Sequence, residues 1–155
     1  MAVKPIPEGY HTATPYLIVK GAAEAIEFYK RAFGAAELFR MPGPDGRIGH
    51  AELQVGTSRL MLADENPGMK AFGPAHFGGS PVTLMLYVED VDKVIQRAVD
   101  AGATIERPIA NQFYGDRSGG IVDPFQHRWY IATHVEDVAP EEMDRRMKAQ
   151  HPELG

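Results

Sequence analysis

The segment Gly49-His50-Ala51-Glu52 carries the strongest candidate for chemistry in this chain. In an extended strand, residues two apart project from the same face, so the His50 imidazole and the Glu52 carboxylate are expected to lie side by side. Such a pair suits general acid–base chemistry. We expect Glu52 to act as a base with a raised pKa, because burial disfavours the charged form of a carboxyl group. His50 and Glu52 are therefore the predicted catalytic residues.

Several other kinds of site are excluded. The chain has no cysteine, which rules out disulfides and thiol nucleophiles. It contains no nucleophile elbow, phosphate-binding glycine loop, HExxH sequence or dinucleotide fingerprint. A formal net charge of −5 argues against nucleic acid as a partner. No apolar run approaches the ~18 residues of a membrane span, and residues 1–11 lack the apolar centre of a signal peptide. We therefore expect a cytoplasmic protein with no membrane partner.

The elements that must position His50 and Glu52 occur twice. Each copy has a short apolar strand, then an amphipathic helix that ends at a glycine. Val19 and Val88 are 69 residues apart, and the glycines Gly34 and Gly102 are 68 apart. A repeat of this length indicates a supersecondary unit that packs against its own copy.

Each copy predicts a βαβββ module. In the first, strands are expected at 12–19, 36–41, 47–55 and 59–63, with a helix at 22–33. In the second, strands are expected at 82–88, 104–109, 118–122 and 127–134, with a helix at 91–101. The predicted fold class is α+β, with two tandem βαβββ modules forming a pseudo-symmetric open barrel around a central cavity.

The chain is expected to be a single domain, 1–155, because two half-length modules would each be marginal alone. We predict a first module at 12–64, a linker at 65–81, a second module at 82–134 and a C-terminal tail helix within 135–155. Residues 66–81 are rich in glycine and proline. They are interpreted as an inter-module linker or as a flap over the cavity, since long loops in compact domains often serve as lids.

Several short motifs strengthen this assignment. They are Tyr16-Leu17-Ile18-Val19, Ala25-Ile26-Glu27-Phe28-Tyr29, Phe33-Gly34, Gly49-His50-Ala51-Glu52-Leu53, Gly115-Asp116-Arg117 and Asp123-Pro124-Phe125-Gln126-His127-Arg128-Trp129. Together with the order of elements, they resemble the vicinal oxygen chelate superfamily, which includes glyoxalase I, extradiol dioxygenases and the fosfomycin- and bleomycin-resistance proteins. The last two motifs look most like its PhnB-like branch, with Gln126 where glycine is usual. The resemblance covers residues 12–134.

The resemblance implies a divalent metal held by four inward-facing side chains, one on each of four strands. Matching the motifs places these positions at Thr14, Glu52, Thr83 and Tyr130. Hydroxyl groups are poor ligands for Zn²⁺, Ni²⁺ or Fe²⁺, which favour imidazole and carboxylate. We therefore predict no metal at these positions and no other cofactor.

A relocated metal site is the alternative. It would use His50 and Glu52 with His134 and His11 from the barrel rim. The preferred interpretation is that Glu52 is a buried acid hydrogen-bonded to His50 and held by Thr14, Thr83, Tyr130 or Arg117.

Two functions follow from the resemblance. One is an enzyme of lyase or dioxygenase type that acts on a small oxygenated or anionic metabolite, with Glu52 at the polar centre of the cavity. The other is a metal-free protein that sequesters a drug-like molecule. Superfamily members commonly pair or exchange modules, so a homodimer is expected. The predicted ligand-binding residues are Thr14, Tyr16, Thr83, Met85, Tyr114, Arg117 and Tyr130.

Overall fold

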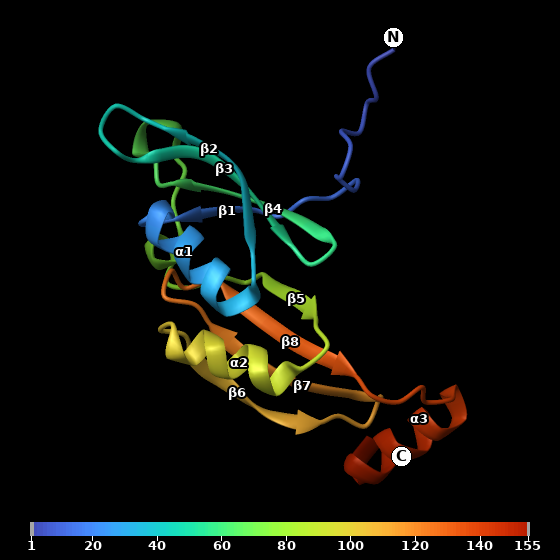
Figure 1. Cartoon of the computed structure of the whole chain (residues 1–155). Coiled ribbons are helices and arrows are strands. Elements are labelled where there is room, and N and C mark those ends of the chain that lie inside the picture. The colour runs from blue at the N-terminus through green and yellow to red at the C-terminus, as the bar shows by residue number, and fades with distance from the viewer. Residues whose placement is uncertain (1, 155) are drawn as a thin grey trace.

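The computed structural model describes residues 2–154 and consists of two modules joined through their helices (Figure 1). The first module comprises β1 (Tyr16–Val19), α1 (Ala22–Phe33), β2 (Ala36–Pro42), β3 (Ile48–Val55) and β4 (Ser58–Asp64). The second comprises β5 (Thr83–Tyr87), α2 (Val91–Asp100), β6 (Thr104–Asn111), β7 (Asp116–Val122) and β8 (Arg128–His134).

Shorter elements connect and follow the modules. The 3₁₀ helices η1 (Pro67–Met69) and η2 (Pro74–Phe77) lie in the connecting segment. The helices α3 (Pro140–Gln150) and η3 (Pro152–Leu154) follow β8. The predicted ranges 1–155 and 135–155 include Met1 and Gly155, which lie outside the described residues. Within residues 2–154, no helix is both long enough and apolar enough to cross a membrane.

Each module forms one four-stranded mixed sheet. The strand order is β1-β4-β3-β2 in the first and β5-β8-β7-β6 in the second. The first pair of each sheet, β1 with β4 and β5 with β8, is parallel, and the other pairs are antiparallel. This arrangement confirms the predicted α+β class and the two tandem βαβββ modules.

Local chemistry fixes where the two main helices begin and end. Gly34 stops α1 with a φ of 67°, a conformation that glycine adopts without steric cost. The Asp64 carboxylate accepts hydrogen bonds from the backbone N–H groups of Gly21 and Ala22 at the start of α1. Asp90 caps α2 by accepting from the backbone N–H of Lys93.

The two modules meet on the helix-covered sides of their sheets. The helices α1 and α2 pack against each other, and one apolar core includes residues of both modules. The Phe33 ring of the first module lies 4.8 Å from the Trp129 ring of the second, centroid to centroid. His127 of the second module contacts the Ile18 carbonyl oxygen at 2.8 Å. Trp129 is therefore a core residue.

The opposite side of each sheet is not covered by α1 or α2 (Figure 1). We call these surfaces the first open face, with Tyr16, Phe39, His50, Glu52 and Met61, and the second open face, with Met85, Tyr87, Ser118, Tyr130 and His134. The open faces point away from the shared core, so within one chain they do not enclose the expected central cavity, and the sheets do not close into a barrel. The reason is that both helices pack their apolar stripes into a single core, which leaves the open faces on the outside.

Candidate functional site

His50 and Glu52 lie together on the first open face, on β3. The Glu52 carboxylate is 3.1 Å from His50 Nε2, and the Tyr16 hydroxyl is 2.8 Å from His50 Nδ1. An ionised carboxylate only accepts hydrogen bonds, so the Nε2 atom carries the proton and Nδ1 accepts from the Tyr16 hydroxyl. Glu52, His50 and Tyr16 thus form a continuous hydrogen-bonded array across three strands, because Tyr16 pairs with Met61 of β4, which in turn pairs with Glu52.

The electrostatics of Glu52 differ from the prediction. Its pKa is lowered, first by the Tyr10 hydroxyl and then by His50. The expectation of a raised pKa is wrong, because the Glu52 side chain keeps 25% of its surface exposed and these two neighbours outweigh its desolvation. Glu52 is therefore an anion beside His50 rather than a base with a raised pKa.

Tyr10 is a site residue that the sequence did not reveal. Its hydroxyl is buried beside Glu52 yet makes no hydrogen bond of good geometry. The Arg59 guanidinium holds the segment in place, since it lies 5.3 Å from the centre of the Tyr10 ring and donates from Nε to the Gly9 carbonyl oxygen. Tyr10 precedes the repeated elements, so periodicity carries no information about its position.

The residues expected to hold Glu52 do not gather around it. Thr14 borders a cavity of about 130 Å³ between the modules, together with His11 and Met85. Thr83 opens β5 on the second sheet, and Tyr130 accepts a hydrogen bond from the Ser118 hydroxyl there. His50 is the one predicted partner that contacts Glu52.

Arg117 lies apart from the other predicted ligand-binding residues. Its guanidinium makes two hydrogen bonds of 2.8 Å to the Asp92 carboxylate of α2, on the helix side of the second sheet. It also donates to the Asn111 side chain. A salt bridge to Asp92 therefore holds the Arg117 side chain against α2.

The strand register also corrects the predicted metal positions. Tyr130 pairs with Met85 and Gly120, and Met61 occupies the equivalent place between Tyr16 and Glu52. Met61, and not Glu52, is therefore the counterpart of Tyr130. Threonine, methionine and tyrosine side chains do not suit a divalent metal such as Zn²⁺. Within residues 2–154, no group of three His, Asp or Glu side chains lies close enough together to hold a metal ion, so His11 and His134 do not join His50 and Glu52.

The second open face carries its own polar cluster. His134 contacts the carboxylate of Asp116 at 2.7 Å and that of Asp137 at 2.8 Å. These two carboxylates, Asp137 first, raise the pKa of His134. The Tyr87 hydroxyl donates to Asp116, whose surface is only 4% exposed. The alternation of side chains along β5, β7 and β8 could have revealed this cluster.

Three predicted ligand-binding residues lie near that cluster. The Tyr114 pKa is raised, first by burial and then by the neighbouring Tyr130 hydroxyl. Met85 pairs with Tyr130 across the β5–β8 ladder. The predicted residues are therefore split between the two open faces of one chain.

The connecting segment lies beside Tyr16. A cavity of about 380 Å³ extends from Tyr16 and Ile18 toward Asn66 and Met69. A second cavity, of about 590 Å³, extends from the same two residues toward Phe77 of η2. The segment 66–81 therefore both links the modules and borders the Tyr16 side of the first open face.

Comparisons with known proteins agree with this architecture. Residues 10–131 match the family model described as the Glyoxalase/Bleomycin resistance protein/Dioxygenase superfamily. An uncharacterized protein of Mycobacterium bovis is 44% identical over 140 residues, which cover 88% of this chain and 92% of that protein.

Solved structures of other proteins share this fold. An Arabidopsis thaliana gene product superposes with a TM-score of 0.65 at 29% identity, covering 79% of this chain and 98% of that one. A PhnB protein of Bacillus cereus superposes with a TM-score of 0.64 at 18% identity, over 79% and 99% of the two chains, which supports the fold of the PhnB-like branch. The chain belongs to the glyoxalase/bleomycin resistance protein/dioxygenase superfamily.

Proposed function

We propose that this protein binds a small, partly apolar, oxygenated molecule on the first open face and removes a proton from it. The observation that carries the proposal is the Glu52–His50–Tyr16 array. Tyr16 is 47% exposed and is therefore the member that a ligand reaches first. The Tyr16 oxygen accepts the ligand proton as its own proton moves to His50 Nδ1, and the Glu52 anion stabilises the imidazolium that results.

The surroundings of the array suit a ligand of this class. Phe39 pairs with Glu52 and Met61 pairs with Tyr16, so apolar side chains flank the polar ones along the first open face. Tyr10 and Tyr16 have raised pKa values, each owing first to burial, and both therefore stay protonated near neutral pH as hydrogen-bond donors. The Tyr16 proton is donated to His50, so the Tyr10 hydroxyl is the donor that can hold an oxygen atom of the ligand while Phe39 and Met61 contact its carbon skeleton.

The complete site is proposed to need a second copy of the chain. In a homodimer, the first open face of one protomer would meet the second open face of its partner and enclose the cavity that one chain lacks. This arrangement is supported by large apolar or aromatic side chains exposed on both faces, with Phe39 at 46% and Met41 at 53% on the first sheet and Met85 at 43% and Tyr87 at 66% on the second.

Deuterium exchange tests the proton-transfer step across a whole class of candidate substrates. The protein is incubated in D₂O with a panel of hydroxy-ketones, α-keto acids and α-hydroxy acids, and NMR follows the loss of each α-proton signal. We expect exchange with at least one compound. His50→Ala and Tyr16→Phe should reduce its rate by about 10²-fold or more, the usual contribution of a positioned acid–base group.

The control for this experiment is a second His–Glu pair on the surface. His151 and Glu153 are also two residues apart and contact each other at 3.3 Å, far along the chain from the site. His151→Ala should leave the exchange rate unchanged. Exchange that proceeds equally in the native protein and in His50→Ala would refute the proposal.

Sequestration without chemistry is a second candidate. The side chains at the four positions discussed above, Thr14, Met61, Thr83 and Tyr130, favour it because they do not make an ordinary metal site. Calorimetric titration with metal-free bleomycin, followed by mass spectrometry of the recovered drug, distinguishes the two functions. Tight binding with unaltered drug would support sequestration, whereas a chemically modified drug would exclude it.

A further inference from the structure

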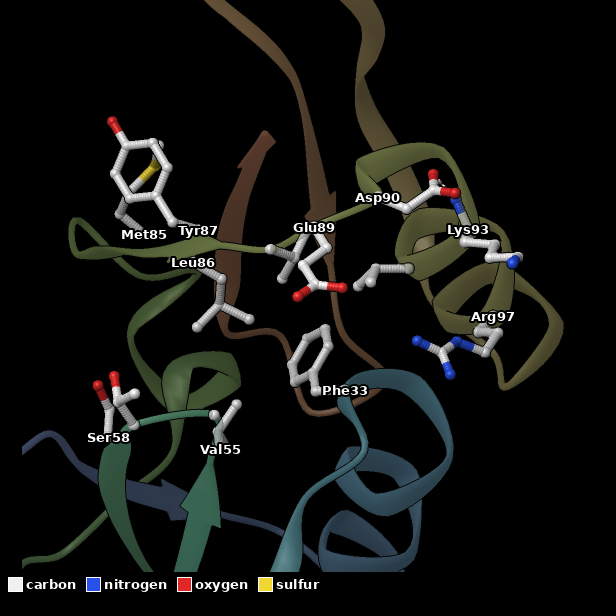
Figure 2. A pocket seen from close by; sticks show the side chains of 14 residues that line it. Phe33, Val55, Ser58, Met85, Leu86, Tyr87, Glu89, Asp90, Lys93 and Arg97 are labelled. Carbon is white, nitrogen blue, oxygen red and sulfur yellow. Dashed lines mark hydrogen bonds between the residues drawn. The ribbon is translucent and has the colours of Figure 1, made fainter. Parts of the chain in front are cut away.

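A cavity of about 700 Å³ lies at the seam between the modules and takes no part in the proposed proton transfer (Figure 2). The end of α1, the turn between β3 and β4, the strand β5 and the first turns of α2 surround it. Its volume falls in the range of ordinary small-molecule pockets. None of Tyr16, His50 and Glu52 lines it.

The floor of this cavity is apolar. Phe33, Val55 and Leu86 are partly buried and pack against the hydrophobic core, with Val94 beside them. Figure 2 shows the Phe33 ring and the Leu86 side chain turned toward the same open space. A ligand placed there would cover an aromatic ring and aliphatic groups that otherwise contact water.

Two side chains of opposite charge lie next to this apolar surface but do not form an ion pair with each other. The carboxylate of Glu89 and the guanidinium of Arg97 both project toward the space above Phe33, from different sides (Figure 2). Within the described part of the chain, neither side chain forms an ion pair. By contrast, Asp92 on the same helix as Arg97 is fully engaged by a bidentate arginine. Glu89 and Arg97 therefore each have a free hydrogen-bonding capacity directed at the cavity.

Of the two basic side chains that line the cavity, Lys93 and Arg97, only Arg97 is directed toward the space beside Glu89 (Figure 2). Lys93 also lines the cavity, but its ammonium group points away from the space between Glu89 and Arg97 in Figure 2. Asp90 is likewise occupied, because its carboxylate caps the first turn of α2. The charges available to a ligand are thus one carboxylate and one guanidinium, separated across an apolar surface.

We propose that this cavity binds a free amino acid with a large apolar side chain. Glu89 binds the α-ammonium group, Arg97 binds the α-carboxylate, and Phe33 and Leu86 contact the side chain. A ligand with only a carboxylate would be repelled by Glu89, and a ligand with only an ammonium group would be repelled by Arg97. A zwitterion satisfies both, and charge-assisted hydrogen bonds give it geometric specificity.

Calorimetry with three related probes tests the proposal. L-phenylalanine carries both charges, N-acetyl-L-phenylalanine lacks the ammonium group, and 2-phenylethylamine lacks the carboxylate. We expect L-phenylalanine to bind at least tenfold more tightly than either analogue. Arg97→Gln and Glu89→Gln should each weaken its binding about tenfold, while Lys93→Gln, one helical turn from Arg97, should have a clearly smaller effect.

The Glu89→Gln variant gives the sharpest outcome. Because Glu89 is the group that should disfavour an analogue without an ammonium group, this variant should lose the discrimination between L-phenylalanine and its N-acetyl derivative. Both substituted side chains are exposed, so the variants are expected to fold. Absence of L-phenylalanine binding at millimolar concentration, equal affinity for the three probes, or binding unchanged in Arg97→Gln would each overturn the proposal.

Discussion

The Tyr29 hydroxyl of the first module donates a 2.6 Å hydrogen bond to the Asp123 carboxylate of the second. Asp123 is 3% exposed, yet its oxygens also accept from the Trp129 indole N–H and from the backbone N–H groups of Phe125 and His127. A buried carboxylate is tolerated when donors surround it in this way. The motif around Asp123, taken as a family signature, is thus the polar joint between the modules.

Loss of this joint should destabilise the whole chain. In Tyr29→Phe the Asp123 carboxylate keeps its other donors but loses one hydrogen bond, which should lower the free energy of unfolding by about 2 kcal/mol. Urea denaturation followed by circular dichroism measures it. Because the modules share one core, we expect a single transition in both proteins. Two separate transitions, or a cost no larger than that of Tyr87→Phe on the exposed second open face, would contradict the prediction.

Much of the fold could be predicted because its signals are local. The helix from Ala22 to Phe33 follows from its apolar periodicity and its stop at Gly34, and its bounds are confirmed. Alternation along β3 correctly placed His50 and Glu52 on one face. Such patterns depend only on residues that are close in the sequence.

What could not be predicted depends on distant contacts. The sequence shows that each sheet has a face without a helix, but not whether the two faces enclose a cavity within one chain. The packing of α1 on α2 and contacts such as that between Tyr29 and Asp123 turn the two faces apart. The lowered pKa of Glu52 was missed for the same reason, since Tyr10 lies 42 residues before it and outside any repeat.

The proposed homodimer predicts that a charge on the first open face separates the protomers. Phe39 is 46% exposed and contributes little to the core of its own chain. Phe39→Asp should therefore keep the circular dichroism spectrum of the native protein but become monomeric by size-exclusion chromatography with light scattering. Met147→Asp, at an exposed apolar residue of α3, is the matched control and should remain dimeric. A native protein that is monomeric at micromolar concentration would contradict the homodimer itself.

Adding a single methyl group at Gly115 is predicted to destabilise the fold strongly. Its φ is 101°, and a β-carbon there would collide with the Glu136 carbonyl oxygen. The Gly115 carbonyl oxygen also accepts from the backbone N–H groups of Val135 and Glu136, so the two segments cannot easily separate. Gly115→Ala should therefore lower the free energy of unfolding by more than Gly46→Ala, where φ is also positive but the space is open. The second variant should cost about 1–2 kcal/mol from backbone strain alone. Equal losses in urea denaturation would show that the collision is relieved.

Titration of His134 is predicted to contribute to the change of stability with pH. Its pKa in the folded protein is raised by Asp137 and Asp116, so protonated His134 stabilises the fold. This contribution is fully present below the unfolded-state pKa of about 6.5 and is lost as the pH rises through the raised folded-state pKa. His134→Gln should remove that part of the pH dependence when urea denaturation is measured from pH 5.5 to 8.5. Identical slopes in the two proteins would contradict the role of these carboxylates.

The Tyr10 hydroxyl is predicted to help keep the Glu52 carboxylate ionised. Its hydroxyl is the first cause of the lowered pKa of Glu52, so Tyr10→Phe should raise that pKa toward the ordinary value. In the native protein the stabilisation linked to Glu52 is present above the unfolded-state pKa and is lost as the pH falls through the lower folded-state pKa. The variant should therefore lose less stability on acidification.

Carbon-13 NMR titration of the glutamate side chains measures this shift directly. Tyr114→Phe removes a hydroxyl from the other module and should leave the Glu52 titration unchanged. Because the Tyr10 hydroxyl makes no hydrogen bond of good geometry, the stability lost in Tyr10→Phe should be limited to the part linked to the Glu52 pKa, and the variant is expected to remain folded. An unchanged Glu52 pKa in Tyr10→Phe would mean that His50 alone keeps the carboxylate ionised, and Tyr10 would then no longer count as a member of the site.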